Sequence, residues 1–174
     1  MDERIDRVVM TQAEIAAAVK VVADKIRHDY AGITPIMVPI MKGAIVFTAD
    51  LLRELGDMPF EFDYVDVSSY AHGASTGDLK VEVNVRKDII NRDIILIDEI
   101  IDTGLTLDFL VKEFTKLGAK SVKSVVAVDK KAGRSVDIEA DYVGAEVPND
   151  YLVGYGMDLD GEMRFLSDIV ALKH

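Results

Sequence analysis

Three carboxylates follow a short apolar run near the middle of the chain, and their spacing suggests a site for a phosphorylated ligand. Asp98 and Glu99 are adjacent, and Asp102 lies three residues further on. The segment 103–106 reads Thr-Gly-Leu-Thr, a turn of mostly small residues. A helix starting there would offer unpaired backbone N–H groups and the positive end of its dipole, and both favour phosphate. Because carboxylates repel phosphate, we expect a cation, Mg²⁺, between the two.

Two lysines occupy comparable positions next to other apolar runs. Lys42 lies in the turn after the run 36–40, and Lys130 follows the run 125–128. A lysine in such a place is usually a solvated neighbour of a turn, but it can also bind an anion. In an open α/β fold the carboxyl ends of the strands share one edge, where ligands bind. Two cations and three carboxylates at one edge therefore predict a site.

The elements that must position these residues alternate between strands and helices along the chain. Apolar, largely β-branched runs predict buried strands. The expected strands are 36–40, 60–67, 94–97 and 121–128, followed by short strands at 142–147 and 151–153. The remaining segment, 154–174, carries no long helical pattern.

Three helices are expected between these strands. The first begins with a capping box at 11–14 and ends before Gly32, the second spans 45–55, and the third ends at Gly118. The expected buried faces are Ile15, Val19, Val22 and Ile26, then Ile45, Ala49, Leu52 and Leu55, then Leu107, Leu110, Val111, Phe114 and Leu117. Strands that alternate with helices predict a doubly wound α/β sheet.

Composition narrows the class of protein. The chain has 174 residues, 49% of them hydrophobic, which is enough for one domain with a full core. Its net charge of −11 argues against a nucleic-acid partner. The absence of cysteine excludes disulfides, and His28, His72 and His174 lack the spacing of metal ligands. With no apolar run long enough to span a membrane and no signal-peptide pattern, we expect a cytoplasmic protein.

One polar stretch interrupts the alternation. Residues 68–78 predict a loop or the tip of a hairpin, with 79–85 as the returning strand. Such a loop beside a site is often a lid, although a solvated hairpin tip has the same composition. Within it, 73–77 match the G-x-S-x-G pattern of serine hydrolases. That motif needs a strand before it and a helix after it. Neither is expected here, so the chain is not expected to be a serine hydrolase.

The run 94–106 resembles the phosphoribosyl-pyrophosphate-binding motif of the type I phosphoribosyltransferase family. That motif is an apolar strand, an acidic pair, two apolar residues and then Asp-Thr/Ser-Gly-x-Thr. Further segments match in the same order: Met41-Lys42-Gly43, Ser69-Tyr70, Lys130, Asp141-Tyr142-Val143-Gly144, Tyr155-Gly156-Met157-Asp158 and Arg164. The resemblance covers the chain from about Thr11 to its end.

The resemblance implies a fold and a domain organisation. Residues 1–174 would form one domain: a doubly wound, mainly parallel sheet with helices on both faces and a small hood of short strands. The hood would combine the N-terminal segment with about 141–174, and a flexible lid would cover about 68–79. Homodimers or homotetramers are common in the family.

The resemblance also implies an activity in purine salvage. The 5-phosphoribosyl group of phosphoribosyl pyrophosphate would be transferred to a 6-oxopurine base, hypoxanthine and/or guanine, giving IMP or GMP and pyrophosphate. Mg²⁺ would be the cofactor, and neither nucleic acid nor a membrane would be a partner. A regulatory protein that keeps the phosphate cradle, and a phosphoribosyltransferase for another base, are the alternatives.

Residue roles follow from the matched positions. Asp102, Thr103, Gly104, Leu105 and Thr106 would hold the 5′-phosphate, and Asp98 and Glu99 the ribose hydroxyls, directly or through Mg²⁺. Lys42, Gly43 and Arg164 would bind pyrophosphate. The purine would contact Lys130, Tyr151, Leu152 and Asp158, and the metal would be bound by Asp98, Glu99 and Asp158. Ser69 and Tyr70 would lie on the lid. Asp102 would be the general base for the attacking ring nitrogen, and its alternative role is the N-cap of the third helix.

Two details of the matched segments differ or vary. The family usually has Glu before Asp in the acidic pair, whereas this chain has Asp98 before Glu99. This exchange keeps the charge but changes the reach of each carboxylate, so which of them contacts ribose is open. In the family, the turn at 41–43 can contain a cis peptide bond that does not precede proline.

Overall fold

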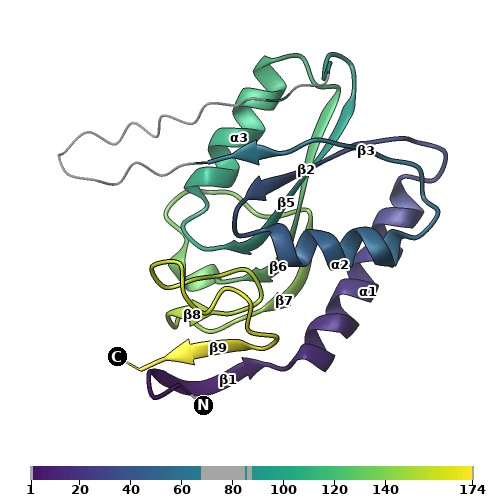
Figure 1. Cartoon of the computed structure of the whole chain (residues 1–174). Coiled ribbons are helices and arrows are strands. Elements are labelled where there is room, and N and C mark those ends of the chain that lie inside the picture. The colour runs from purple at the N-terminus through teal and green to yellow at the C-terminus, as the bar shows by residue number, and fades with distance from the viewer. Residues whose placement is uncertain (1, 68–84, 86–87, 174) are drawn as a thin grey trace.

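A parallel six-stranded sheet forms the centre of the computed structural model, which describes residues 2–67, 85 and 88–173 (Figure 1). The strand order is β3-β2-β5-β6-β7, and β4 also pairs with β2. The strands are β2 (Ile36–Met41), β3 (Glu61–Phe62), β4 (Val65–Asp66), β5 (Asp93–Ile101), β6 (Ser121–Asp129) and β7 (Tyr142–Glu146). Because all of these strands pair in parallel, their carboxyl ends meet at one edge of the sheet.

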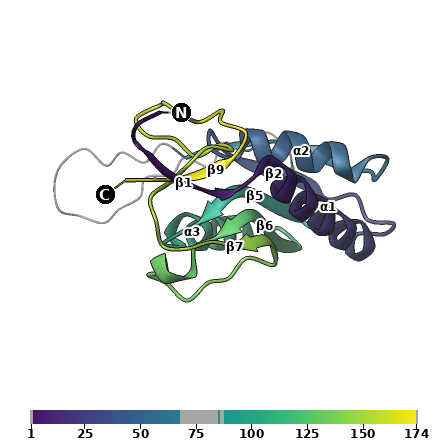
Figure 2. The same ribbon diagram turned by 90° about the horizontal axis from the view of Figure 1, so that it is seen from below.

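Helices cover both faces of this sheet, as the sequence predicts. Helices α1 (Gln12–Asp29) and α2 (Ile45–Leu55) lie on one face, and α3 (Leu105–Lys116) lies on the other (Figure 2). Side chains of β5 alternate between the two cores, because successive residues of a strand point to opposite faces. Ile95 and Ile97 pack toward α1 and α2, whereas Ile94 and Leu96 pack toward α3.

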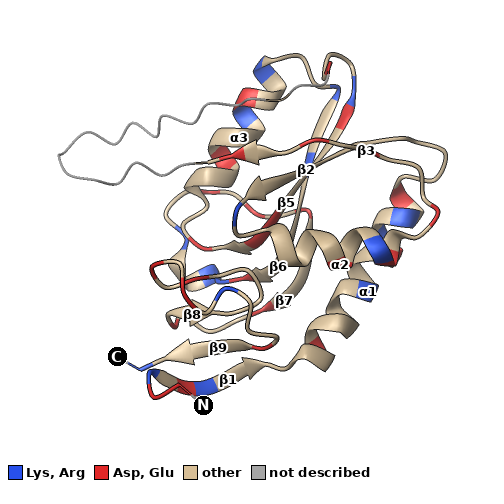
Figure 3. Cartoon of the chain, in the orientation of Figure 1, with Lys and Arg blue, Asp and Glu red and all other residues tan. Residues whose placement is uncertain are grey.

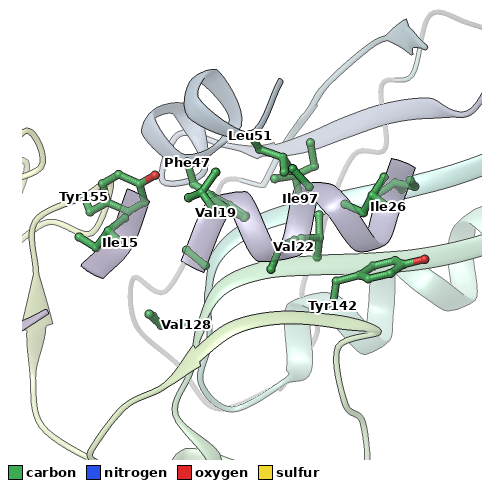
Figure 4. Close-up of a cluster of buried hydrophobic side chains, with 14 of the residues drawn as sticks. Ile15, Val19, Val22, Ile26, Phe47, Leu51, Ile97, Val128, Tyr142 and Tyr155 are labelled. Carbon is green, nitrogen blue, oxygen red and sulfur yellow. The ribbon is translucent and has the colours of Figure 1, made fainter. Parts of the chain in front are cut away.

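Helix α1 forms as its sequence predicts. Thr11 and Glu14 form a capping box in which each side chain bonds the backbone of the other residue. The expected apolar face is buried, and Figure 4 shows Val19, Val22 and Ile26 directed into the core beneath α2. This helix therefore docks through one continuous apolar stripe.

The expected buried face of α2 is right at Leu55 and wrong at Ile45 and Ala49. The buried residues are Phe47, Thr48, Leu51 and Leu55, whereas Ile45 is 42% exposed and Ala49 is also exposed. The helix is apolar on more than one side, so the spacing of apolar residues alone does not fix which side faces the sheet. The cluster around Phe47 in Figure 4, contacted by hood residue Tyr155, settles the orientation.

A second, antiparallel sheet forms the hood and brings the two ends of the chain together (Figure 1). It has the order β1-β9-β8, with β1 spanning Ile5–Met10, β8 Leu152–Val153 and β9 Ile169–Leu172. A hood of short strands from the N-terminal segment and the C-terminal part of the chain was expected and is confirmed, although the bounds of β1 and β9 were not predicted. Strand β7, which lies within the expected hood range of about 141–174, pairs with β6 in the parallel sheet.

Two strands differ in extent from their predictions. The run 60–67 forms two short strands, β3 and β4, separated at Asp63, whose backbone N–H donates to Met37 O at 3.1 Å. Strand β5 continues to Ile101 and pairs there with Asp129 of β6. The expected strand at 79–85 and the 73–77 motif lie largely or wholly outside the described residues. Among the described helices, none is long and apolar enough to cross a membrane.

Candidate active site

The acidic pair lies within strand β5 and not after it. Because β5 extends to Ile101, Asp98 and Glu99 lie among its last four residues, at the carboxyl edge of the sheet. Figure 3 colours the acidic residues of the chain red. The Glu99 N–H donates to Asp98 Oδ1 at 3.0 Å. Burial, and then the charge of Glu99, raise the pKa of Asp98 well above its usual range. Two such neighbouring carboxylates favour a bound cation, because it offsets their repulsion.

Glu99 reaches beneath the turn that follows β2. A Cβ atom added to Gly43 would lie 1.8 Å from Glu99 Oε1, so only glycine fits beside this carboxylate. Glu99 Oε2 is buried and has no hydrogen-bond partner among the described residues. The Met41–Lys42 peptide bond in this turn is cis. The turn and the carboxylate therefore share one wall of the site.

The turn after β5 starts helix α3 without a side-chain cap. Gly104 is the N-cap residue, with a left-handed φ of 83° that suits glycine. The alternative role of Asp102 as N-cap is therefore wrong. Instead, Asp102 Oδ2 lies 2.6 Å from Lys130 Nζ, which also donates to Asp150 O at 3.4 Å. The first N–H group of α3, that of Leu105, donates to Thr103 Oγ1 at 3.4 Å. The next N–H groups of this helix lack an intrahelical partner, as at any helix N-terminus, and suit a ligand.

The C-terminal segment supplies a second ion pair. Arg164 Nη2 lies 2.5 Å from Asp158 Oδ1, and Arg164 Nη1 donates to Gly156 O at 2.5 Å. A Cβ atom on Gly156 would lie 2.1 Å from Gly43 O, so the hood packs directly on the turn after β2. This contact joins Arg164 to the wall formed by Gly43 and Glu99.

One cavity of about 610 Å³ brings most of the expected residues together. Its lining includes Lys42, Gly43, Asp98, Glu99, Asp102, Thr103, Gly104, Thr106, Asp158 and Arg164. Lys130, Leu105, Tyr151 and Leu152 are outside this lining; Tyr151 is 52% exposed, and Leu152 is buried. Ser69 and Tyr70 lie outside the described residues. The structure thus gathers the residues expected for the phosphates and the metal, and connects Lys130 to them through Asp102.

Three polar residues near the site were missed from the sequence. Asp66, at the end of β4, lines the cavity. Asp129, which is buried, and Arg134, which is partly buried, form an ion pair next to the turn after β5. Asp66 and Asp129 could have been found, since each ends a strand at the same edge of the sheet. Arg134 had no such signal, because its contacts are with Asp129 and with backbone carbonyl groups.

The charge of the cavity lining favours an anionic ligand that binds together with metal cations. Among the described lining residues, the carboxylates outnumber the basic side chains, Lys42 and Arg164. In the described part of the chain, no three His, Asp or Glu side chains are grouped closely enough to hold a metal ion. Mg²⁺ commonly uses one or two carboxylates together with substrate phosphates and water. The pair Asp98 and Glu99, with its unpartnered buried oxygen, fits that mode of binding.

Comparison with known proteins gives a consistent result. A model of the phosphoribosyl transferase domain matches residues 9–160. The hypoxanthine-guanine phosphoribosyltransferase of Bacillus subtilis (strain 168) is 40% identical over 174 residues, which cover 99% of this chain and 96% of that protein. The bifunctional protein TilS/HprT of Listeria monocytogenes is also 40% identical, but the match covers only 27% of its length.

Solved structures share the fold as well. A mutant of the hypoxanthine phosphoribosyltransferase of Trypanosoma cruzi, complexed with the product IMP, is 35% identical with a TM-score of 0.91. The match covers 99% of this chain and 94% of that one.

Proposed function

The chain belongs to the phosphoribosyl transferase domain family, and we propose that it is an enzyme of purine salvage. It transfers the 5-phosphoribosyl group of phosphoribosyl pyrophosphate to hypoxanthine or guanine, giving IMP or GMP and pyrophosphate. The observation that carries this proposal is the single cavity lined from three distant segments: the turn after β2, the end of β5 with its turn, and the C-terminal hood.

The turn after β5 is proposed to hold the 5′-phosphate. Backbone N–H groups of 102–106 and the hydroxyls of Thr103 and Thr106 are the donors, and the N-terminus of α3 adds its dipole. Asp98 and Glu99 then face the ribose hydroxyls. This assignment places the sugar over the acidic pair, with its anomeric carbon toward the centre of the cavity.

Lys42, Gly43 and Arg164 are proposed to receive the pyrophosphate. Both cations line the cavity, and Gly156, whose carbonyl accepts from Arg164, contacts Gly43, the residue after Lys42. Arg164 is paired with Asp158 in this structure, so binding pyrophosphate requires the guanidinium to exchange part of that contact. Charge that develops on the leaving group is then met by side chains already in the site.

Mg²⁺ is the proposed cofactor: Asp98 and Glu99 would hold one ion, and Asp158 would hold a second. When bound, the metal supplies positive charge that neutralises the pyrophosphate and the carboxylates together. The support for this role is the orphaned Glu99 oxygen and the excess of carboxylates around the cavity.

The base is proposed to bind at Lys130, Tyr151, Leu152 and Asp158. Lys130 Nζ donates to the 6-oxo group, and Asp102 beside it accepts the proton of a ring nitrogen as general base. The separation of 2.6 Å between the two groups suits neighbouring positions on one edge of a purine. The exposed ring of Tyr151 is free to stack on the base. A donor at Lys130 disfavours adenine, whose 6-amino group is itself a donor.

The remaining assignments rest on the resemblance and on the composition of the chain. We propose one domain over residues 1–174, a lid at about 68–79 carrying Ser69 and Tyr70, a homodimer or homotetramer, and a cytoplasmic location. Sedimentation of the purified protein tests the assembly: a monomer at micromolar concentration contradicts it.

Pyrophosphate release tests the proposed reaction. Purified protein, Mg²⁺ and phosphoribosyl pyrophosphate are mixed with hypoxanthine, guanine, xanthine or adenine in separate assays. We expect release with hypoxanthine or guanine and none with adenine. Silence with all four bases contradicts the proposal, and release with adenine alone points to a transferase for another base.

A further inference from the structure

Three consecutive carbonyl groups at the start of the proposed phosphate turn are held by one short segment. Arg134 Nη1 donates to Ile101 O at 3.2 Å and to Asp102 O at 2.6 Å. Ser135 donates to Thr103 O from its backbone N–H at 2.9 Å and from its Oγ at 3.2 Å. The segment thus bonds every carbonyl from the end of β5 to the residue before Gly104.

Arg134 is itself fixed by a buried carboxylate. Its Nη2 lies 2.5 Å from Asp129 Oδ1, and Asp129 is only 1% exposed. A planar guanidinium can bond a carboxylate and two carbonyls at once, because its donors form a rigid fork. The ammonium of a lysine is a single point and cannot bridge these partners in the same way.

The direction of these carbonyls fixes the direction of the neighbouring N–H groups. Across a trans peptide, the C=O of one residue and the N–H of the next point in opposite directions. The carbonyls of Asp102 and Thr103 point to Arg134 and Ser135, and Ile101 O is shared between Arg134 and the Lys130 N–H, which donates to it at 3.0 Å. The N–H groups of 102–104 therefore point away from these donors. Asp102, Thr103 and Gly104 line the cavity, whereas Arg134 and Asp129 are not among its described lining residues.

The turn also packs closely against this segment. A Cβ atom on Gly104 would lie 2.7 Å from Ile138 Cγ2 and 3.0 Å from Arg134 Cδ. The turn is therefore pressed against the segment that bonds its carbonyls, on the side away from the cavity.

We propose that Arg134, held by Asp129, is a positioning residue for 5′-phosphate binding. It draws the carbonyls of the turn away from the cavity and leaves a surface of N–H donors facing the phosphate. It acts through the turn and does not touch the ligand. This inference rests on the proposed function, in which the turn binds the 5′-phosphate.

The test compares two ligands that differ only in the 5′-phosphate. Dissociation constants of IMP and inosine are measured with the purified protein, and their ratio reports the contribution of the phosphate. In Arg134→Lys we expect the ratio to fall about tenfold, because the N–H donors lose their alignment. A merely structural role would weaken both ligands equally and leave the ratio unchanged.

Arg92→Lys is the matched control. Arg92 likewise joins a carboxylate, Glu61 Oε1 at 2.5 Å, to a backbone carbonyl, Thr34 O at 3.5 Å, but at the amino end of the sheet. We expect its ratio to equal that of the wild type. An unchanged ratio in folded Arg134→Lys, or an equal fall in Arg92→Lys, overturns the inference.

A second variant covers the case in which Arg134→Lys does not fold. Ser135→Ala removes one donor to Thr103 O and leaves the ion pair intact, so the ratio should fall about two- to threefold. No change in that ratio overturns the inference. If the wild type itself does not prefer IMP over inosine, the proposed function fails and the inference fails with it.

Discussion

Asp102 and Lys130 hold each other at the edge of the sheet where the proposed purine site lies. Their charged atoms are 2.6 Å apart, and the Lys130 side chain is 13% exposed whereas that of Asp102 is 41% exposed. The pair keeps the carboxylate accessible while fixing its direction. This arrangement suits a general base better than a helix cap, because no cap bond is made.

Asp102→Asn tests that role. The amide keeps the shape of the side chain but cannot accept a proton, so we expect kcat to fall by about 100-fold or more. The KM for phosphoribosyl pyrophosphate should change far less, because the backbone donors of the turn remain. Steady-state kinetics with hypoxanthine or guanine measure both values. An unchanged kcat would exclude the role of general base.

Residue-level reasoning from the sequence identified most of the cavity lining because acids and lysines at strand ends carry a visible signal. Of the two roles considered for Asp102, only the helix N-cap is wrong, since the left-handed Gly104 and not the carboxylate begins α3. It missed Arg134, whose contacts are with backbone carbonyls that no residue type reveals.

Among the elements, the hood is joined to α2 by one buried tyrosine. Tyr155 packs its ring on Phe47, with ring centroids 6.4 Å apart, and donates from its hydroxyl to Asp50 Oδ2 at 2.9 Å. Burial, followed by the charge of Asp50, raises the pKa of Tyr155 above its ordinary value. The neighbouring Gly156 contacts the turn after β2, so this anchor also supports the proposed pyrophosphate site.

Tyr155→Phe should lower the free energy of unfolding by about 1 kcal/mol, since it removes one hydrogen bond and keeps the ring. We also expect a higher KM for phosphoribosyl pyrophosphate, because the hood supports Gly43 and Arg164. Tyr142→Phe is the control: its hydroxyl donates to Asp29 Oδ2 at 2.8 Å, away from the cavity. Denaturant unfolding and kinetics of both variants check this. A KM effect of equal size in Tyr142→Phe would contradict the anchoring role.

Alkaline pH tests the same anchor. A group whose pKa is raised by folding stabilises the protein fully below its unfolded pKa, and this contribution is lost as pH rises. The unfolded pKa of tyrosine is 10.0, so wild-type stability should decline above that pH. The decline should be shallower in Tyr155→Phe, as measured by denaturant unfolding across this range. If the free energy of unfolding declined equally with pH in the two proteins, the anchoring role of Tyr155 would be contradicted.

Element-level prediction succeeded where one face of an element is apolar and failed where the signal was weak or ambiguous. Helix α1 carries a single stripe and was placed correctly, whereas α2 is apolar on several sides and its face was partly misassigned. Strand β1 is mostly exposed, and it is placed by its antiparallel pairing with β9 at the other end of the chain. Such a long-range pairing has no local pattern in the sequence.

At the scale of the whole molecule, the negative net charge of the protein opposes the binding of an anionic substrate. The chain has a net charge of −11, and acidic residues also outnumber basic ones among the described cavity residues. The proposed substrate is nevertheless a polyanion. Helix α3, Lys42 and Arg164 offset part of that repulsion. The doubly wound topology could be predicted from the alternating elements, but this charge balance required the positions of the side chains.

Removal of divalent metal should therefore abolish activity. With excess EDTA we expect pyrophosphate release to fall to background, and added Mg²⁺ should restore it, because the carboxylates then no longer repel the substrate unopposed. Thermal unfolding in EDTA serves as the control, since the fold has its own full core and should not depend on the metal. Full activity in EDTA would contradict the proposed cofactor.

A crystal structure with IMP, pyrophosphate and Mg²⁺ tests the central claim most directly, because it locates all three parts of the proposed site at once. We expect the 5′-phosphate within hydrogen-bond distance of the backbone N–H groups of 102–106. The pyrophosphate should contact Lys42 and Arg164, and the 6-oxo group should accept from Lys130. A 5′-phosphate bound away from the turn after β5, or a base bound away from Lys130, would contradict the account.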